Sequence, residues 1–86
     1  MEKDLLETFV MLAGVNNISK TAQALYISQA AVSHRLKKLE ESVGAELVLR
    51  SKGAKQTQLT AAGRQFLPLA QNWLDIDREV ENFQHR

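Results

Sequence analysis

Four small or polar side chains at the start of one predicted helix could read the edges of nucleic-acid bases. Ser28 is a good N-cap residue, and Gln29, Ala30, Ser33 and His34 follow it within about two helical turns. A glutamine amide can hydrogen-bond an adenine edge twice, and an alanine methyl group can meet the thymine methyl group. Serine is small enough to let a helix enter a groove, and histidine can donate to guanine or phosphate. The plainer alternative is an ordinary exposed helix start.

Residues 18–39 predict the elements that position these side chains, namely two short helices joined by a tight turn. Asn17 or Ser19 can cap the first helix, and the second covers about Gln29–Ser42. The inner side of the second helix is apolar and its outer side is polar and basic. This arrangement suits a helix that packs into a domain on one side and into a DNA major groove on the other.

Further residues near these helices have the chemistry to contact a nucleic-acid backbone. Hydroxyl and amino groups at helix termini commonly bind phosphate oxygens. The candidates on the helices are Lys20, Thr21, Ser28, Lys37 and Lys38, and those in the expected hairpin are Arg50, Lys52 and Lys55. Lys38 could instead pair with a neighbouring carboxylate such as Glu41, and a lysine-rich turn is also typical of any exposed hairpin.

The rest of the chain predicts a mainly α fold. Asp4–Ala13 has helical apolar spacing, and Gly14 is a plausible C-cap. Residues 46–50 and 56–59 alternate like two short strands around a turn, which predicts the wing of a winged helix. The predicted fold is therefore a winged helix-turn-helix of three helices and a two-stranded wing, followed by a long helix over residues 60–84.

The long helix carries two apolar stripes. One follows the heptad spacing of helices that pair, and it consists of Phe66, Leu69, Trp73, Ile76, Val80 and Phe83. The other consists of Ala62, Leu67, Ala70 and Leu74. One small domain cannot cover both stripes, so we expect the second to pack on the first helix and the heptad stripe to form a dimer seam. The acidic residues of this helix, Asp75, Asp77, Glu79 and Glu81, are expected to face solvent.

Length and charge fit a small domain that meets phosphates. The chain has 86 residues and no cysteine, which excludes disulfides and thiolate zinc sites and fits the reducing cytoplasm. No apolar run approaches the roughly 20 residues of a membrane helix. Three acidic residues lie between Lys20 and Arg64, against eight basic ones, which are Lys20, Arg35, Lys37, Lys38, Arg50, Lys52, Lys55 and Arg64. A basic centre between acidic ends is typical of a surface that faces phosphates.

The sequence argues against two other classes of function. An enzyme is disfavoured because His34 and His85 are far apart in the sequence and no nucleophile, metal cluster or phosphate loop accompanies them. We therefore expect no catalytic residue, metal or cofactor. A winged-helix protein-interaction module is the alternative, but it would need neither the basic centre nor the polar outer side of residues 29–37.

Several linked motifs resemble the DNA-binding domain of LysR-type transcriptional regulators. They are Ile18–Leu39, Glu40-Glu41, Gly44, Leu47, Arg50 and Leu59-Thr60-Ala61-Ala62-Gly63, in the family's order. Thr21 stands where the family usually has alanine, and Val48 where it commonly has phenylalanine. Both are packing positions.

The resemblance implies a bacterial reader of promoter DNA, with residues 1–59 as the DNA-binding domain and residues 60–86 as a linker and dimerisation helix. It implies a homodimer with two antiparallel long helices that binds interrupted palindromes. Members of the family also carry a larger C-terminal effector domain, which lies outside these 86 residues, so we expect any small-molecule effector to act only through that domain.

Overall fold

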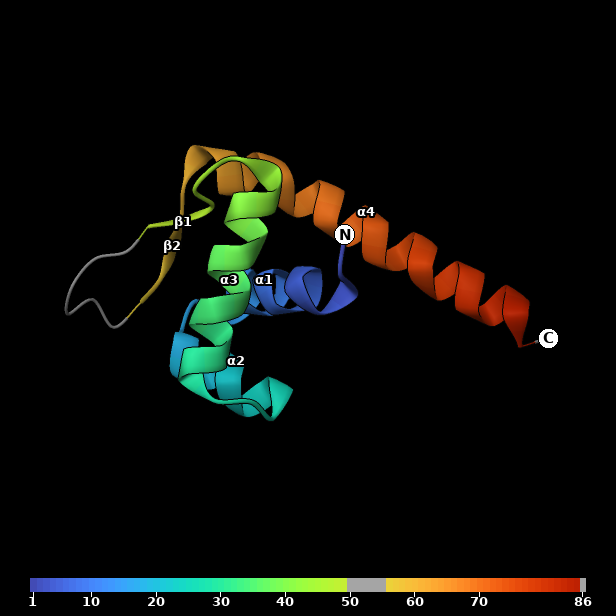
Figure 1. Ribbon diagram of the computed structural model, residues 1–86, viewed down its shortest axis with the longest axis horizontal. Helices are drawn as coiled ribbons and strands as arrows, with labels where there is room; N and C mark the ends of the chain where they lie inside the picture. Colours follow the sequence, from blue (N-terminus) through green and yellow to red (C-terminus); the bar gives the residue numbers. More distant parts are fainter. Residues whose placement is uncertain (50–55, 86) are drawn as a thin grey trace.

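The computed structural model describes residues 1–49 and 56–85, and within them the chain forms four helices and a two-stranded sheet (Figure 1). The elements in chain order are α1 (Lys3–Val15), α2 (Ile18–Leu25), α3 (Gln29–Val43), β1 (Val48–Leu49), β2 (Gln58–Leu59) and α4 (Ala61–Gln84). This confirms the predicted winged helix-turn-helix followed by a long helix. The hairpin candidates Arg50, Lys52 and Lys55 lie outside the described residues.

Three of the helices begin where the sequence places a capping side chain. The Asn17 side chain accepts a hydrogen bond from the Lys20 backbone N–H at 2.8 Å. Ser28 does the same for Ala31 at 3.0 Å, and Thr60 for Gly63 at 2.9 Å. Each cap satisfies one of the N–H groups that a helix start leaves unpaired. The predicted starts of α2, α3 and α4 are confirmed.

The predicted end of the first helix is wrong by two residues. Gly14 lies inside α1, and the helix ends at Val15, followed by the C-cap residue Asn16 in the left-handed conformation with φ 56°. The Asn16 N–H donates to the Leu12 carbonyl oxygen at 2.7 Å. Asparagine tolerates this conformation better than most residues, so the helix continues past the glycine to the next residue that can end it.

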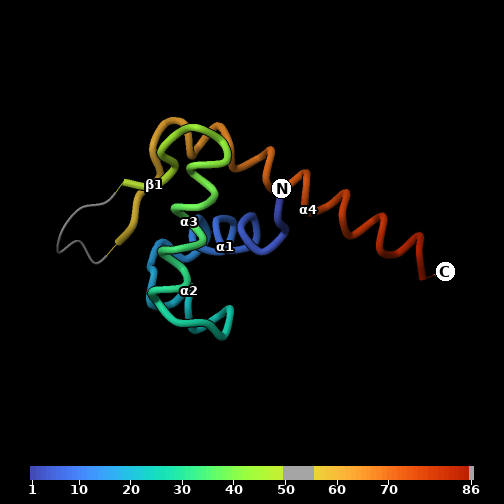
Figure 2. Tube along the Cα trace, in the orientation of Figure 1, coloured from blue at the N-terminus to red at the C-terminus, as the bar shows by residue number. Residues whose placement is uncertain are grey.

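The core lies around α1, which packs against α2, α3 and α4 (Figures 1 and 2). Its buried side chains come mainly from α1, α3 and the segment that enters β1, and they include Leu6, Phe9, Leu12, Val32, Leu36, Leu39, Leu47 and Val48. Buried apolar surface of this kind is the main source of stability in a small domain. The inner side of α3 is therefore fixed against α1, which leaves its outer side to solvent.

Hydrogen bonds join the hairpin to the rest of the domain. β1 and β2 pair antiparallel, with Val48 opposite Leu59. The Thr57 N–H donates to the Asn16 carbonyl oxygen at 2.9 Å. The buried Glu40 carboxylate of α3 accepts from the Leu47 N–H at 2.7 Å. A two-stranded sheet alone is marginal in water, so these contacts hold it in place.

The α4 helix is 24 residues long, includes Pro68 and extends beyond the body of the molecule (Figure 1). The expected heptad stripe is divided in the structure. Phe66 and Trp73 are partly buried against the core, and the Phe66 ring lies 5.8 Å from that of Phe9. The side chains that stay largely exposed are Leu69, Ile76, Val80 and Phe83, each at least half exposed. No described helix is long and apolar enough to cross a membrane.

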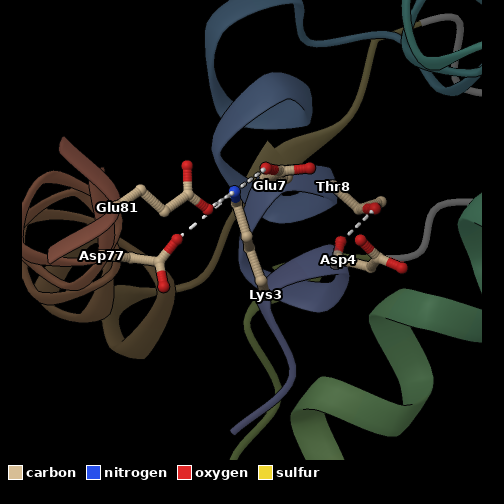
Figure 3. Close-up of polar contacts among 6 residues, drawn as sticks. All are labelled: Lys3, Asp4, Glu7, Thr8, Asp77 and Glu81. Carbon is tan, nitrogen blue, oxygen red and sulfur yellow. Dashed lines mark hydrogen bonds and ion pairs between the residues drawn. The ribbon is translucent and has the colours of Figure 1, made fainter. Parts of the chain in front are cut away.

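Two of the acidic residues on α4 do not simply face solvent as expected. Asp77 and Glu81 both face Lys3 at the start of α1 (Figure 3). The Lys3 Nζ atom lies 3.3 Å from Asp77 Oδ2 and 3.1 Å from Glu81 Oε1. The expectation failed because the sequence pattern does not show that α4 runs past the N-terminus of α1, where a cation can reach it.

Candidate nucleic-acid interface

The exposed start of α3 lies beside the start of α2. Gln29, Ala30 and Ser33 line one side of a shallow depression of about 400 Å³. The other side is formed by Asn17, Ile18 and Ser19 of the α2 start and by Thr57 before β2. Three of the four predicted base-reading residues are thus brought together. Because two helix N-termini border the same surface, their free N–H groups favour an anion there.

The Gln29 side chain is held toward α2. Its Nε2 atom donates a hydrogen bond to the Ser19 hydroxyl oxygen at 3.3 Å. A glutamine amide has two N–H donors and a carbonyl acceptor, so this bond uses one donor and restricts the rotation of the others. Gln29 is therefore exposed and partly oriented, which reduces the conformational entropy that it would lose on binding.

His34 lies on a neighbouring part of the surface. It shares a second open depression of about 430 Å³ with Lys37, Lys38 and Glu41. The Lys38 Nζ atom lies 3.2 Å from Glu2 Oε1, so its partner is Glu2 and not Glu41. His34 and Lys37 are exposed on α3 beyond the Gln29 cluster. The predicted contact residues of α3 therefore form a strip along the helix and not one compact cluster.

Thr21 is a correction to the predicted backbone contacts. Its side chain is fully buried, and its hydroxyl group donates to the Asn17 carbonyl oxygen at 2.8 Å, one helical turn earlier. A β-branched residue can fill core space while its hydroxyl is satisfied in this way. The Thr21 side chain cannot reach a phosphate, so its role is in packing.

The other predicted backbone contacts of the helices are accessible. Lys20 is exposed on the first turn of α2, and Ser28 is exposed at the start of α3. The Ser28 oxygen accepts the capping bond from Ala31, which leaves its hydroxyl hydrogen available to an acceptor. Arg35 turns inward, where its Nη1 atom donates to the Thr8 hydroxyl oxygen at 3.3 Å.

Sequence reasoning did not assign a surface role to Asn17, Ser19 or Thr57. Asn17 and Ser19 were considered only as helix caps, although their position at the start of α2 is a signal for anion contact. Thr57 belongs to the hairpin, and only the folded chain places it beside α2 and α3. Its proximity depends on the backbone bond to Asn16, which no local pattern predicts.

The described part of the chain contains no group of three or more His, Asp or Glu side chains that could hold a metal ion. The two α3 depressions are open and lined by polar, small and charged side chains. Such a surface offers hydrogen bonds and positive charge to an extended partner.

A model of a known protein family matches residues 4–64 of the chain, and its description is bacterial regulatory helix-turn-helix protein, lysR family. The chain belongs to the lysR family. The match includes α1, α2, α3, both strands and the first turn of α4. The resemblance inferred from the motifs is thereby confirmed: this chain has the helix-turn-helix DNA-binding domain of the lysR family.

Relatives and solved structures agree with this family. The HTH-type transcriptional regulator HdfR of Escherichia coli strain SE11 is 37% identical over 84 residues, which cover 93% of this chain and 29% of HdfR. The lysR-family chain therefore spans less than a third of the length of this relative.

Two solved structures show the same fold. The complex of the CbnR DNA-binding domain with DNA matches with a TM-score of 0.91 at 29% identity, over 99% of this chain and 95% of that one. Vibrio fischeri DarR, also in complex with DNA, matches with a TM-score of 0.88 at 35% identity, over 99% of this chain and 29% of DarR.

Proposed function

We propose that this chain reads the sequence of promoter DNA through the start of α3 and binds as a homodimer joined through α4. The observation that carries the first part is the polar outer side of α3. Gln29, Ala30 and Ser33 stand exposed beside the start of α2, while Val32 and Leu36 bury the opposite side of the helix. A helix fixed in this way can enter a major groove while the core of the domain stays folded.

The residues of α3 divide into roles by their chemistry. Gln29 reads an adenine edge and Ala30 contacts a thymine methyl group. Ser33 allows close approach, and His34 donates to a guanine acceptor or to phosphate. The CbnR DNA-binding domain and DarR structures are complexes with DNA, which supports the same class of ligand for this chain.

Backbone contacts supply affinity that does not depend on sequence. Lys20, Ser28 and Lys37 are exposed around the α3 start and can reach phosphates on either side of a groove. Lys38 can join them by exchanging its exposed pair with Glu2 for a phosphate, since such surface pairs are weak. Arg50, Lys52 and Lys55 remain predicted wing contacts from the sequence.

The dimer is supported by the apolar side of α4. Leu69, Ile76, Val80 and Phe83 are exposed along one side of the helix in a single protomer. An exposed apolar row of this length is typical of a protein interface. A two-fold symmetric pair of α4 helices presents two α3 helices to two half-sites, so an interrupted palindrome is the expected target.

Two substitutions test the division of roles. Gln29→Ala should reduce the preference for the selected site over a scrambled duplex, with a loss of about 1–3 kcal/mol at the base it reads. Lys20→Ala should weaken binding to both duplexes equally and lower the dependence of affinity on salt by about one counterion.

Fluorescence anisotropy at several salt concentrations measures both effects. The proposal fails if Gln29→Ala, like Lys20→Ala, loses as much affinity for the scrambled duplex as for the selected one. Circular dichroism of each variant shows whether the fold is intact. We expect an intact fold because both residues are exposed.

A further inference from the structure

One side of α4 changes from apolar to acidic where the helix leaves the body. The side that faces α1 carries Phe66, Ala70, Leu74, Asp77 and Glu81, spaced by four, four, three and four residues. Phe66, Ala70 and Leu74 pack against the apolar core. Asp77 and Glu81 continue the same side of the helix but face the ammonium group of Lys3. Beyond Leu74, the attachment of α4 to α1 is therefore polar.

Lys3 joins carboxylates of two helices (Figure 3). Its Nζ atom lies 3.1 Å from Glu81 and 3.3 Å from Asp77 on α4, and 3.8 Å from Glu7 on α1. The Asp77 Oδ2 atom is shielded from solvent, and its contact with Lys3 is an ion pair without the geometry of a good hydrogen bond. Removal of the lysine would leave Asp77 and Glu81 of α4 near Glu7 of α1 without the cation between them, so repulsion from Glu7 would turn α4 away from α1.

The direction of α4 decides how far apart two α3 helices stand in a dimer joined through α4. A helix of 24 residues is roughly 36 Å long. The helix is packed on the core as far as Leu74, so only its last ten residues, roughly 15 Å, are free to turn. A turn of about 10° there moves the far end by roughly 3 Å, close to one base-pair step of about 3.4 Å. A restraint on this angle is therefore a restraint on the spacing of the two half-sites.

We propose that Lys3, through Asp77 and Glu81, holds α4 at a set angle to the helix-turn-helix body and so determines which half-site spacing the dimer accepts. Lys3 is a positioning residue, because it lies at the start of α1 and acts only through α4. The inference rests on the proposed dimeric binding of DNA. It differs from that proposal in its readout, which is the spacing preference and not the sequence of either half-site.

The test uses the palindrome that the wild-type chain selects from random duplexes. A second library keeps both half-sites of that palindrome and varies only the number of base pairs between them. The wild-type chain should enrich a narrow range of spacings. Lys3→Met should lower the ratio of affinity for the best spacing to that for its neighbours by about threefold to tenfold, the range that two exposed ion pairs can supply. The selected half-site sequence should not change.

Two variants separate this role from a general effect of charge or folding. Lys3→Arg keeps the cation and should retain the wild-type spacing. Arg78→Met removes a cation that pairs within α4 with Asp75, so it should leave the spacing unchanged. The double variant Lys3→Asp with Asp77→Lys restores opposite charges and should recover part of the narrow preference.

The outcomes distinguish the two proposals. An unchanged spacing ratio in folded Lys3→Met overturns the positioning role while leaving the dimeric reader intact. If Arg78→Met broadens the spacing preference as much as Lys3→Met does, the effect comes from net charge, and the positioning role of Lys3 is overturned as well. If the wild-type chain enriches no palindrome, the proposed function itself fails, and the role of Lys3 fails with it.

Discussion

Gly63 in the first turn of α4 lies directly against the carbonyl oxygen of Leu47, at the entry to β1. A Cβ atom on Gly63 would overlap that oxygen and would also crowd the Leu59 side chain. The same Leu47 oxygen accepts a hydrogen bond from the Thr60 N–H at 3.0 Å. The start of α4 and the two strands are thus packed backbone to backbone, and glycine is the residue that permits it.

Gly63→Ala should destabilise the chain. An added methyl group must push backbone and not a flexible side chain, and overpacking of this kind costs about 1–3 kcal/mol. Gly14→Ala is the matched control, because Gly14 is also helical but has nothing near its missing Cβ. That substitution should stabilise α1 by up to about 1 kcal/mol. Urea denaturation measures both, and stabilisation by both would contradict the packing of Gly63.

Tyr26 should be replaceable with a gain in stability. It adopts the left-handed conformation with φ 57° between α2 and α3, and its side chain is 94% exposed. A residue with a Cβ atom loses roughly 1 kcal/mol in this conformation. Tyr26→Gly should therefore raise the free energy of unfolding by about 0.5–1 kcal/mol. Asn16→Gly should raise the free energy of unfolding by less, since asparagine already tolerates its φ of 56°. An equal or greater increase at Asn16 would contradict the strain inferred at Tyr26.

The ion pairs of Lys3 should appear in its titration. The pKa of Lys3 is raised above its ordinary value of 10.5, first by the hydrogen bond to Glu81 and then by Asp77. Because the folded-state pKa exceeds the unfolded one, the charged lysine stabilises the fold below pH 10.5 and loses this effect as the pH rises through the folded-state pKa. The difference in unfolding free energy between wild type and Lys3→Met should therefore shrink in that alkaline range.

Side-chain NMR of Lys3 gives the pKa directly. Glu81→Gln should lower the pKa more than Glu7→Gln, because the Glu7 carboxylate is the more distant at 3.8 Å. A Lys3 pKa at or below the ordinary value in the wild-type chain would show that the contacts with α4 do not form in solution.

The exposed side of α4 predicts a dimer that one charge can break. Ile76 is 60% exposed in a single protomer, so Ile76→Glu should leave the fold intact while burying a charge at the proposed seam. Sedimentation equilibrium should show a monomer for this variant. Asn82→Glu adds the same charge to α4 away from the apolar row and should remain dimeric. A wild-type chain that is monomeric at high concentration, without DNA, would count against the seam.

Local signals in the sequence predicted the elements well. Capping residues Asn17, Ser28 and Thr60 mark helix starts because the cap is a contact within four residues. The end of α1 was misplaced because Gly14 and Asn16 can both end a helix, and local preference does not choose between them. The polar outer side of α3 followed from its periodicity and is confirmed by the exposure of Gln29 and Ser33.

Contacts between distant segments were not predictable from local patterns. Thr21 has the chemistry of a phosphate contact, yet its complete burial removes it from the surface. Phe66 and Trp73 share a heptad stripe with Leu69 and Ile76, but of these four only Phe66 and Trp73 pack against the core of the same protomer. Lys3 and Glu81 are separated by 78 residues, so only the packing of α1 on α4 brings them together.

The most direct test of the central claim is selection by the wild-type chain from a random duplex library, with binding measured at two salt concentrations. A dimer that reads bases through α3 should enrich an interrupted palindrome whose half-sites weaken with Gln29→Ala, and its affinity should fall as salt rises. Absence of binding at low salt would contradict it. Salt-sensitive binding without any enriched sequence would contradict the reading of bases by α3.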